Sequence, residues 1–289
     1  MSLRQIESII TPPDHHWVGD GLKVQNFIPS KIPWERISPF VMLDYGPKNN
    51  FPPSEVPKGV GSHPHRGFET VTIVYKGRLE HNDSRGNSGI IGEGEVQWMT
   101  AGSGILHKEY HEKNFSKSGG ELQMVQLWVN LPAKDKMTEP KYQALTKNEI
   151  VRLELQNEAG TAQIIAGEFN GQKGPAFTFS PVNLVNLHLK PNSETDILIP
   201  KDFNASILVL EGEVEINGEK VVENKMALLK NDGNEEVVIK AKKNSILLII
   251  SGQPLNEPIA SYGPFLMNSR EEIIQAMEDF ENGKFGELE

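Results

Sequence analysis

Residues 61–77 read GSHPHRGFETVTIVYKG, and this stretch sets the interpretation of the whole chain. The β-branched run from Glu69 to Val74 favours a strand. Residues two apart in a strand point to the same face, so His63 and His65 project together if Pro64 lies at a strand edge or start, where its missing N–H is tolerated. The pair is either incidental or half of a metal site whose other half lies elsewhere in the chain.

A second pair of potential ligands, His107 and Glu109, follows the glycine-rich residues 102–104. Hairpin signals between the two pairs predict a meander that brings the later strand back beside the first. Adjacent strands of a barrel would then join three imidazoles and one carboxylate. Such ligands suit Fe(II), Mn(II), Ni(II), Cu(II) or Zn(II), with positions left open for substrate and dioxygen. Because only neutral imidazoles bind metal, affinity is expected to fall as the pH drops through about 6.

The composition is that of an ordinary soluble protein. The chain has 289 residues, of which 37% are hydrophobic and 24% are charged, and this length predicts one large domain or two modest ones. It has no cysteine, which excludes disulfides, thiolate ligands and a cysteine nucleophile. The net charge is -10 without a dense basic patch, so direct binding of nucleic acid has no support. No apolar run reaches the roughly 18 residues of a membrane span, and no signal peptide is evident, so a cytoplasmic location is expected.

Strand signals dominate the chain, which predicts an all-β protein built as a sandwich or barrel. One convincing helix follows Ser269, where Ser-Arg-Glu-Glu272 fits a capping box and Gly283 fits a C-terminal stop. The expected strands are residues 40–43, 70–75, 96–99, 122–129, 164–166, 182–189, 207–210, 237–239 and 246–250.

A weak internal echo suggests two similar β-domains. Residues 73–80 and 208–215 each run through an apolar stretch to a glycine and then resume an alternating strand. We therefore divide the chain into residues 1–132, which contain the candidate metal ligands, and residues 133–289, which lack them and end in the helix. If Gly77 corresponds to Gly212, Leu198 and Pro200 take the places of the two histidines, and the second domain is expected to be structural.

Other polar residues near the two pairs have simpler interpretations. His81 and Asp83 precede Ser-Arg-Gly and are expected on a polar hairpin face. Glu69 either reaches the outer shell of the metal or pairs with a basic residue across a strand. Arg66 is expected to point away from His65 and to anchor a carboxylate. His111 is either a pocket residue or an exposed strand end, and Trp98 and Trp128 are expected in the core.

Three stretches carry a resemblance to a known family: residues 63–71 (HPHRGFETV), residues 97–109 (QWMTAGSGILHKE) and residues 127–131 (LWVNL). They resemble pirin, and YGPFLMN at 262–268 with the acidic helix resembles the pirin C-terminus. The resemblance implies a bicupin, with two cupin-type (jelly-roll) β-barrels in one chain and a short C-terminal helix. It also implies that His63, His65, His107 and Glu109 are the metal ligands and that the metal is iron, most simply Fe(II).

Two functions are implied by the same four residues. Bacterial relatives resemble flavonol 2,3-dioxygenases, which open quercetin with O2 and release carbon monoxide; vertebrate pirin is described as an iron-dependent transcription co-regulator. In the first, Glu109 is the catalytic base that accepts the 3-hydroxyl proton of a small aromatic substrate. In the second, the metal orders a surface for a protein partner. Oxygenation of another enolisable substrate is a third possibility, and we favour the dioxygenase.

Overall fold

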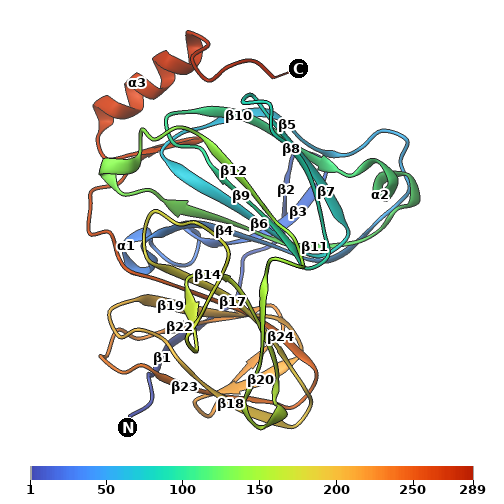
Figure 1. The fold of residues 1–289 in the computed structure, drawn as a ribbon, viewed down its shortest axis with the longest axis vertical. Coiled ribbons are helices and arrows are strands. Elements are labelled where there is room, and N and C mark those ends of the chain that lie inside the picture. The colour runs from blue at the N-terminus through green and yellow to red at the C-terminus, as the bar shows by residue number, and fades with distance from the viewer. Residues whose placement is uncertain (1, 289) are drawn as a thin grey trace. The chain divides into compact units, whose positions relative to one another are not determined.

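The computed structural model describes residues 2–288, and its contacts divide them into two compact units. The first barrel comprises residues 14–30, 39–147 and 255–288, and the second barrel comprises residues 2–13, 31–38 and 148–254. Each unit contains a seven-stranded sheet, a four-stranded sheet and a two-stranded hairpin, all with antiparallel pairing (Figure 1). The fold is therefore all-β with two cupin-type barrels, as predicted. None of the helices in the described chain has the length and apolarity of a membrane-spanning helix.

The first barrel contains the candidate site. In spatial order, its seven-stranded sheet consists of β12 (Lys141–Leu145), β9 (Glu95–Thr100), β6 (Phe68–Lys76), β11 (Gly120–Asn130), β4 (Phe40–Phe51), β3 (Leu22–Ile28) and β2 (His16–Val18). Its four-stranded sheet consists of β5 (Gly59–His65), β10 (Ile105–His111), β7 (Arg78–Asp83) and β8 (Ser88–Gly92). Its other elements are the hairpin β25 (Ala260–Tyr262) and β26 (Phe265–Met267), the helices α2 (Lys113–Ser118) and α3 (Arg270–Glu281), and the 3-10 helix η1 (Ala133–Asp135).

The second barrel repeats this plan. Its seven-stranded sheet consists of β1 (Ile6–Ile10), β22 (Lys225–Leu229), β19 (Asn204–Glu211), β24 (Ser245–Gly252), β17 (Val182–Leu189), β14 (Gly160–Ala166) and β13 (Val151–Glu154). Its four-stranded sheet consists of β18 (Ser193–Leu198), β23 (Glu236–Ala241), β20 (Glu213–Ile216) and β21 (Glu219–Val222). The short elements are β15 (Glu168–Phe169), β16 (Gln172–Lys173), α1 (Trp34–Ile37) and η2 (Gln156–Glu158).

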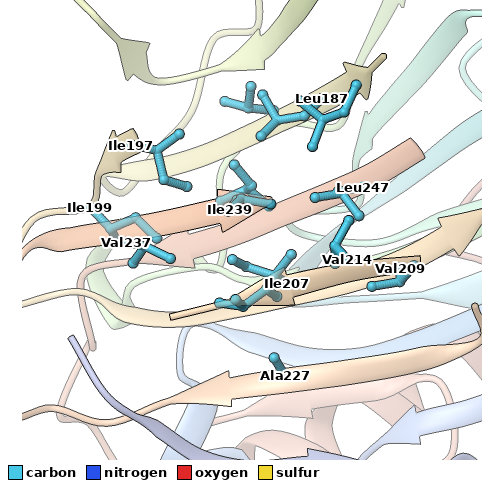
Figure 2. Packing of buried hydrophobic residues seen from close by; sticks show 14 of the residues in the cluster. Leu187, Ile197, Ile199, Ile207, Val209, Val214, Ala227, Val237, Ile239 and Leu247 are labelled. Atoms are coloured by element: carbon cyan, nitrogen blue, oxygen red, sulfur yellow. The ribbon is translucent and has the colours of Figure 1, made fainter. Parts of the chain in front are cut away.

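The core of the second barrel lies between its two sheets. Figure 2 shows Ile207 and Leu247 of the seven-stranded sheet and Ile239 of the four-stranded sheet pointing into this space, and all three are fully buried. Burying such a side chain contributes about 1.5–3 kcal/mol. Aliphatic side chains therefore fill the space between the two sheets of this barrel.

The internal echo marks equivalent corners of the two barrels. Gly77 joins β6 to β7, and Gly212 joins β19 to β20. At each corner the chain leaves the seven-stranded sheet and enters the four-stranded sheet. Both glycines have a positive φ, +84° and +90°, which a residue with a Cβ adopts only at a cost. The repeated glycine therefore reflects a repeated turn. Strand β18 takes the place in the second barrel that β5 takes in the first, and it ends at Leu198, whereas β5 ends with His63 and His65.

The compact units differ from the predicted division at residue 132 in three places. Strand β12 pairs with β9, which extends the first barrel to residue 147. Strand β1 pairs with β22, which assigns the N-terminal residues to the second barrel. The C-terminal helix α3 belongs to the first barrel, because Asp279 forms a buried ion pair with Arg66. Long-range pairing decides all three, and it leaves no local signal in the sequence.

Local structure follows the predicted signals. Every expected strand lies inside an observed strand, and residues 182–189 coincide with β17. Helix α3 begins after Ser269, whose side chain accepts from the Glu272 N–H while Glu272 accepts from the Ser269 N–H. Gly283 follows the helix with φ +73°. The capping box and the glycine stop are confirmed.

Candidate metal centre

Strands β5 and β10 bring the two predicted pairs of ligands side by side. His107 stands opposite His63 and Ile105 opposite His65 in their antiparallel register, which is irregular between His107 and Glu109. The ring centroids are 4.8 Å apart for His63 and His65, 4.3 Å for His63 and His107, and 4.8 Å for His65 and His107. The meander expected between the pairs therefore produces the predicted convergence.

Two overlapping groups of side chains could hold a metal ion. One contains His63, His65 and His107, and the other contains His81, His107 and Glu109; within each group the potential ligand atoms lie within 4.8 Å of one another. The four predicted ligands are thus spread over two groups that share His107. Sequence reasoning missed His81, which it placed on a polar hairpin face.

Each of the three imidazoles of the first group has one nitrogen free for a metal. The His63 Nδ1 donates to the Gly61 carbonyl at 2.7 Å, which leaves Nε2. His65 donates to the Pro264 carbonyl, and its buried Nδ1 has no hydrogen-bond partner. The buried Nε2 of His107 likewise has none. A buried polar atom without a partner is costly, and a metal ion would satisfy both orphaned atoms. These residues therefore fit a metal.

Burial keeps two of these rings neutral. Desolvation, reinforced by the neighbouring imidazoles, lowers the pKa values of His65 and His107 well below the usual 6.5. The neutral imidazole is the form that binds metal. Protonation of these two rings therefore requires a more acidic solution than the pH of about 6 expected from the sequence alone.

Behind His107 lies a chain of buried hydrogen bonds. Asp83 Oδ2 lies 3.2 Å from His81 Nε2, and His81 Nδ1 lies 3.4 Å from His107 Nδ1. The side chains of His81 and Asp83 are fully buried, so the hairpin-face interpretation was wrong. The pKa of Asp83 is lowered although burial opposes this, because His81, Asn87 and Arg85 donate to the carboxylate. An ionised Asp83 can only accept, so His81 Nε2–H donates to it. His81 Nδ1 then accepts from His107 Nδ1–H, and the His107 Nε2 lone pair is free.

Glu109 is held by donors from the seven-stranded sheet. Its carboxylate accepts from Thr72 Oγ1 at 3.2 Å, from Gln126 Nε2 at 3.4 Å and from Gln97 Nε2. The residue is 3% exposed. Together the three donors fix the direction of both oxygens. Glu109 is therefore an oriented, buried carboxylate beside the histidines.

A cavity of about 380 Å³ opens onto this cluster. It is within the range of small-molecule sites, and its lining is mostly apolar with a few polar groups, as such sites require. Trp128, expected in the core, lines the cavity with its ring centroid 5.1 Å from that of His65. The lining residues are Val18, Leu22, Val24, Met42, Asp44, Val60, His63, His65, Glu109, Met124, Gln126, Trp128, Gly263 and Pro264.

The C-terminal segment contributes Gly263 and Pro264 to the lining of the cavity. Arg66 pairs with Asp279 at 2.9 Å, as expected of a residue that anchors a carboxylate. Lys284 and Arg66 lower the pKa of Asp279 to about 2. Gly67 has φ +88°, and a Cβ there would meet the Leu266 carbonyl oxygen at 2.0 Å. Only glycine allows β26 to approach this closely beside His65.

Glu69 and His111 lie away from the candidate ligands. Thr72 contacts Glu109, so strand alternation places Glu69 on the opposite face of β6, where it accepts from Thr100 Oγ1 at 2.7 Å. An outer-shell role for Glu69 is thus excluded. His111 is buried and its Nε2 donates to the Gly21 carbonyl at 2.8 Å, so it is neither an exposed strand end nor part of the cavity lining.

Glu69 gives a prediction about pH. Burial raises its pKa from 4.5 to about 7. The folded state therefore binds more protons than the unfolded state between these values, and the stabilisation is complete below pH 4.5 and lost as the pH rises through 7. We expect Glu69→Gln to gain about 3 kcal/mol in free energy of unfolding relative to the parent on going from pH 4.5 to pH 8.5. Urea unfolding at the two pH values checks this, with Glu121→Gln, the same change at an exposed glutamate, as the matched control.

Comparisons with known proteins identify the family of this chain. The pirin family model matches residues 21–129, and the model of the pirin C-terminal cupin domain matches residues 184–286. The protein named putative quercetin 2,3-dioxygenase PA2418 of Pseudomonas aeruginosa is 48% identical over 98% of this chain and 99% of its own. This chain is a pirin. A pirin-like protein of Solanum lycopersicum is 40% identical over 93% of this chain and 88% of its own.

A solved pirin relative shares the whole fold. The crystal structure of quercetin 2,3-dioxygenase from Acinetobacter baumannii superimposes with a TM-score of 0.95 at 42% identity and covers 100% of both chains. In the present pirin, a larger hollow of about 690 Å³ lies in the second barrel, but its lining contains no histidine. Both groups able to hold a metal among the described residues lie in the first barrel.

Proposed function

We propose that this pirin is a metal-dependent dioxygenase that opens flavonols such as quercetin, consuming one O2 and releasing one CO per flavonol. The observation that carries the proposal is the largely apolar cavity that ends on His63, His65 and Glu109. The names of the Pseudomonas and Acinetobacter relatives support the same substrate class. A regulator whose metal only orders a surface has no need of such a cavity, so the enzyme is the better interpretation.

The proposed ligands are His63, His65, His107 and Glu109, and the proposed metal is Fe(II). A bound cation would supply Lewis acidity that lowers the pKa of the flavonol 3-hydroxyl. The three imidazoles present lone pairs, and Glu109 accepts the 3-hydroxyl proton when its oxygen lies about 2.6–3.2 Å from the hydroxyl. Thr72 and Gln97 hold that carboxylate in place. The apolar walls exclude water from the reacting ring.

The test is a paired measurement on one sample. The chain is reconstituted anaerobically with Fe(II), its metal stoichiometry is determined, and quercetin loss, O2 uptake and CO release are followed after air is admitted. Equal, metal-dependent quercetin loss, O2 uptake and CO release are the expected result. One equivalent of metal without turnover of quercetin or other flavonols would overturn the dioxygenase and favour the regulator. If the chain failed to bind metal, the proposed metal centre would be disproved.

The chain of hydrogen bonds behind His107 predicts the effect of Asp83→Asn. Both Asp83 oxygens accept hydrogen bonds, Oδ1 from the Arg85 N–H and Oδ2 from His81. In Asp83→Asn the NH2 group replaces one of these oxygens, so in either orientation of the amide it faces another donor. We expect the affinity for Fe(II) or Zn(II) to fall about 10–100-fold, as for other outer partners of metal ligands. Competition with a chelator measures it. Glu80→Gln on the same strand is the control, and equal affinities of the two variants would disprove the role of Asp83.

A further inference from the structure

A row of polar side chains crosses the interior face of the seven-stranded sheet at one level. Each member stands directly opposite the next in the strand register, and the row runs from Gln97 on β9 through Thr72, Gln126 and Asp44 to Asn26 on β3. The first three contact Glu109. The proposed chemistry therefore explains the first three members of the row and leaves Asp44, the next member, without a role.

Asp44 is held in one orientation by Asn26. The Asn26 Oδ1 accepts from the Ser30 N–H at 3.1 Å and from the Ser30 hydroxyl at 2.6 Å. The Asn26 amide group must therefore donate, and its Nδ2 lies 2.7 Å from Asp44 Oδ1. A carboxylate fixed through one oxygen presents the other, Oδ2, as an acceptor. The arrangement is that of a built acceptor rather than a mobile surface acid.

Asp44 faces the substrate cavity from an apolar wall. It is 8% exposed and lines the cavity together with Met42, Met124 and Val24. Burial raises the pKa of its carboxyl group, as expected for an acid removed from water. A ligand that fills the cavity removes water from this acceptor, and a donor carried in by the ligand offsets the cost of that desolvation.

The strand spacing places Asp44 at a useful distance from the metal ligands. Gln126 contacts Glu109 at 3.4 Å, and Asp44 lies on the next strand, about 4.8 Å further along the row. A ligand whose first hydroxyl is at Glu109 can therefore present a second hydroxyl, on another part of the same aromatic framework, to Asp44. A single-hydroxyl ligand cannot satisfy both acceptors.

We propose that Asp44 is a specificity-determining residue that accepts a hydrogen bond from a second hydroxyl of the substrate, so that the site selects polyhydroxylated aromatic compounds. This inference rests on the proposed function, since it deepens the choice of substrate at the same site. Sites built to hydrogen-bond a hydroxyl discriminate strongly against analogues that lack it, because the buried acceptor then stays unpaired.

The experiment compares two ligands in two protein forms. Quercetin and 3-hydroxyflavone share the 3-hydroxyl, but 3-hydroxyflavone lacks the others. Dissociation constants are measured anaerobically by quenching of tryptophan fluorescence, for the Fe(II)-loaded full chain and for Asp44→Asn. We expect the parent to bind quercetin more tightly than 3-hydroxyflavone. In Asp44→Asn the ratio of the two dissociation constants should fall about tenfold, because quercetin alone binds more weakly. Met42→Ala, which alters an apolar part of the same wall, is expected to weaken both ligands alike.

Asp44→Leu provides a second variant, with a side chain of similar size that has no acceptor. Its preference for quercetin over 3-hydroxyflavone is expected to fall at least as much as that of Asp44→Asn. An unchanged ratio of the two dissociation constants in both variants would overturn the proposal. The result is separable from that of the proposed function. O2 uptake with an unchanged ratio refutes Asp44 alone, whereas a collapsed ratio without turnover of either flavonol refutes the dioxygenase and retains Asp44 as a ligand-selecting residue.

Discussion

His107→Ala is expected to remove bound metal and flavonol turnover together. His107 is the residue shared by both groups able to hold a metal, and its ring is fully buried beside those of His63 and His65. Removing it deletes a ligand and also disconnects the hydrogen bonds that end at Asp83. The loss of metal affinity should exceed the about 10–100-fold expected for an outer partner alone. Metal analysis after gel filtration and O2 uptake with quercetin provide the two readouts.

A matched control is available on the same strand. His111 shares the face of His107 on β10 and is also buried, but its Nε2 bonds to the Gly21 carbonyl and it does not line the cavity. His111→Ala removes an equivalent imidazole without touching the candidate ligands, so it should retain metal. If His107→Ala kept a full equivalent of metal with unchanged affinity, the proposed ligand set would be wrong.

Much of the fold was readable from local sequence. The corner glycines Gly77 and Gly212, the capping box at Ser269 and the apolar runs all act over a few residues, so their consequences can be predicted from the chain alone. The pairing of β12 with β9 and of β1 with β22 depends on edges that form only when the sheets assemble. The predicted boundary at residue 132 therefore differs from the compact units.

The candidate site divides in the same way. His63, His65, His107 and Glu109 lie at i, i+2 spacing, which strand geometry alone converts into a shared face. His81 and Asp83 have the same i, i+2 spacing, but the turn residues after them favoured a hairpin face. The role of His81 depends on its position opposite Glu109 in the register of β7 and β10. Asp44 gave no signal, since its place between Asn26 and Gln126 depends on the register of β4 with β3 and with the distant β11. Register is a property of the assembled sheet, so the cross-strand neighbours of these residues could not be predicted from the sequence.

Glu109→Gln is expected to separate metal binding from proton transfer. Three imidazoles remain in the variant, so most of the metal should stay bound, while the group that accepts the 3-hydroxyl proton is lost. General-base catalysis contributes about 10²–10⁴-fold, and turnover should fall by that factor. The substitution also places an amide among the donors Thr72, Gln97 and Gln126, and a flip of the Gln126 amide would relieve the resulting conflict.

Two readouts distinguish the lost base from general damage to the site. Deprotonation of a bound flavonol shifts its absorption band to longer wavelength, so the variant should require a higher pH for this shift than the parent does. Glu69→Gln makes the same chemical change at a buried carboxylate on the opposite face of β6 and should leave turnover intact. Unchanged turnover in Glu109→Gln would exclude Glu109 as the base. Loss of metal together with turnover would instead make its carboxylate an indispensable ligand, and proton transfer would then have to be assigned to another group facing the cavity.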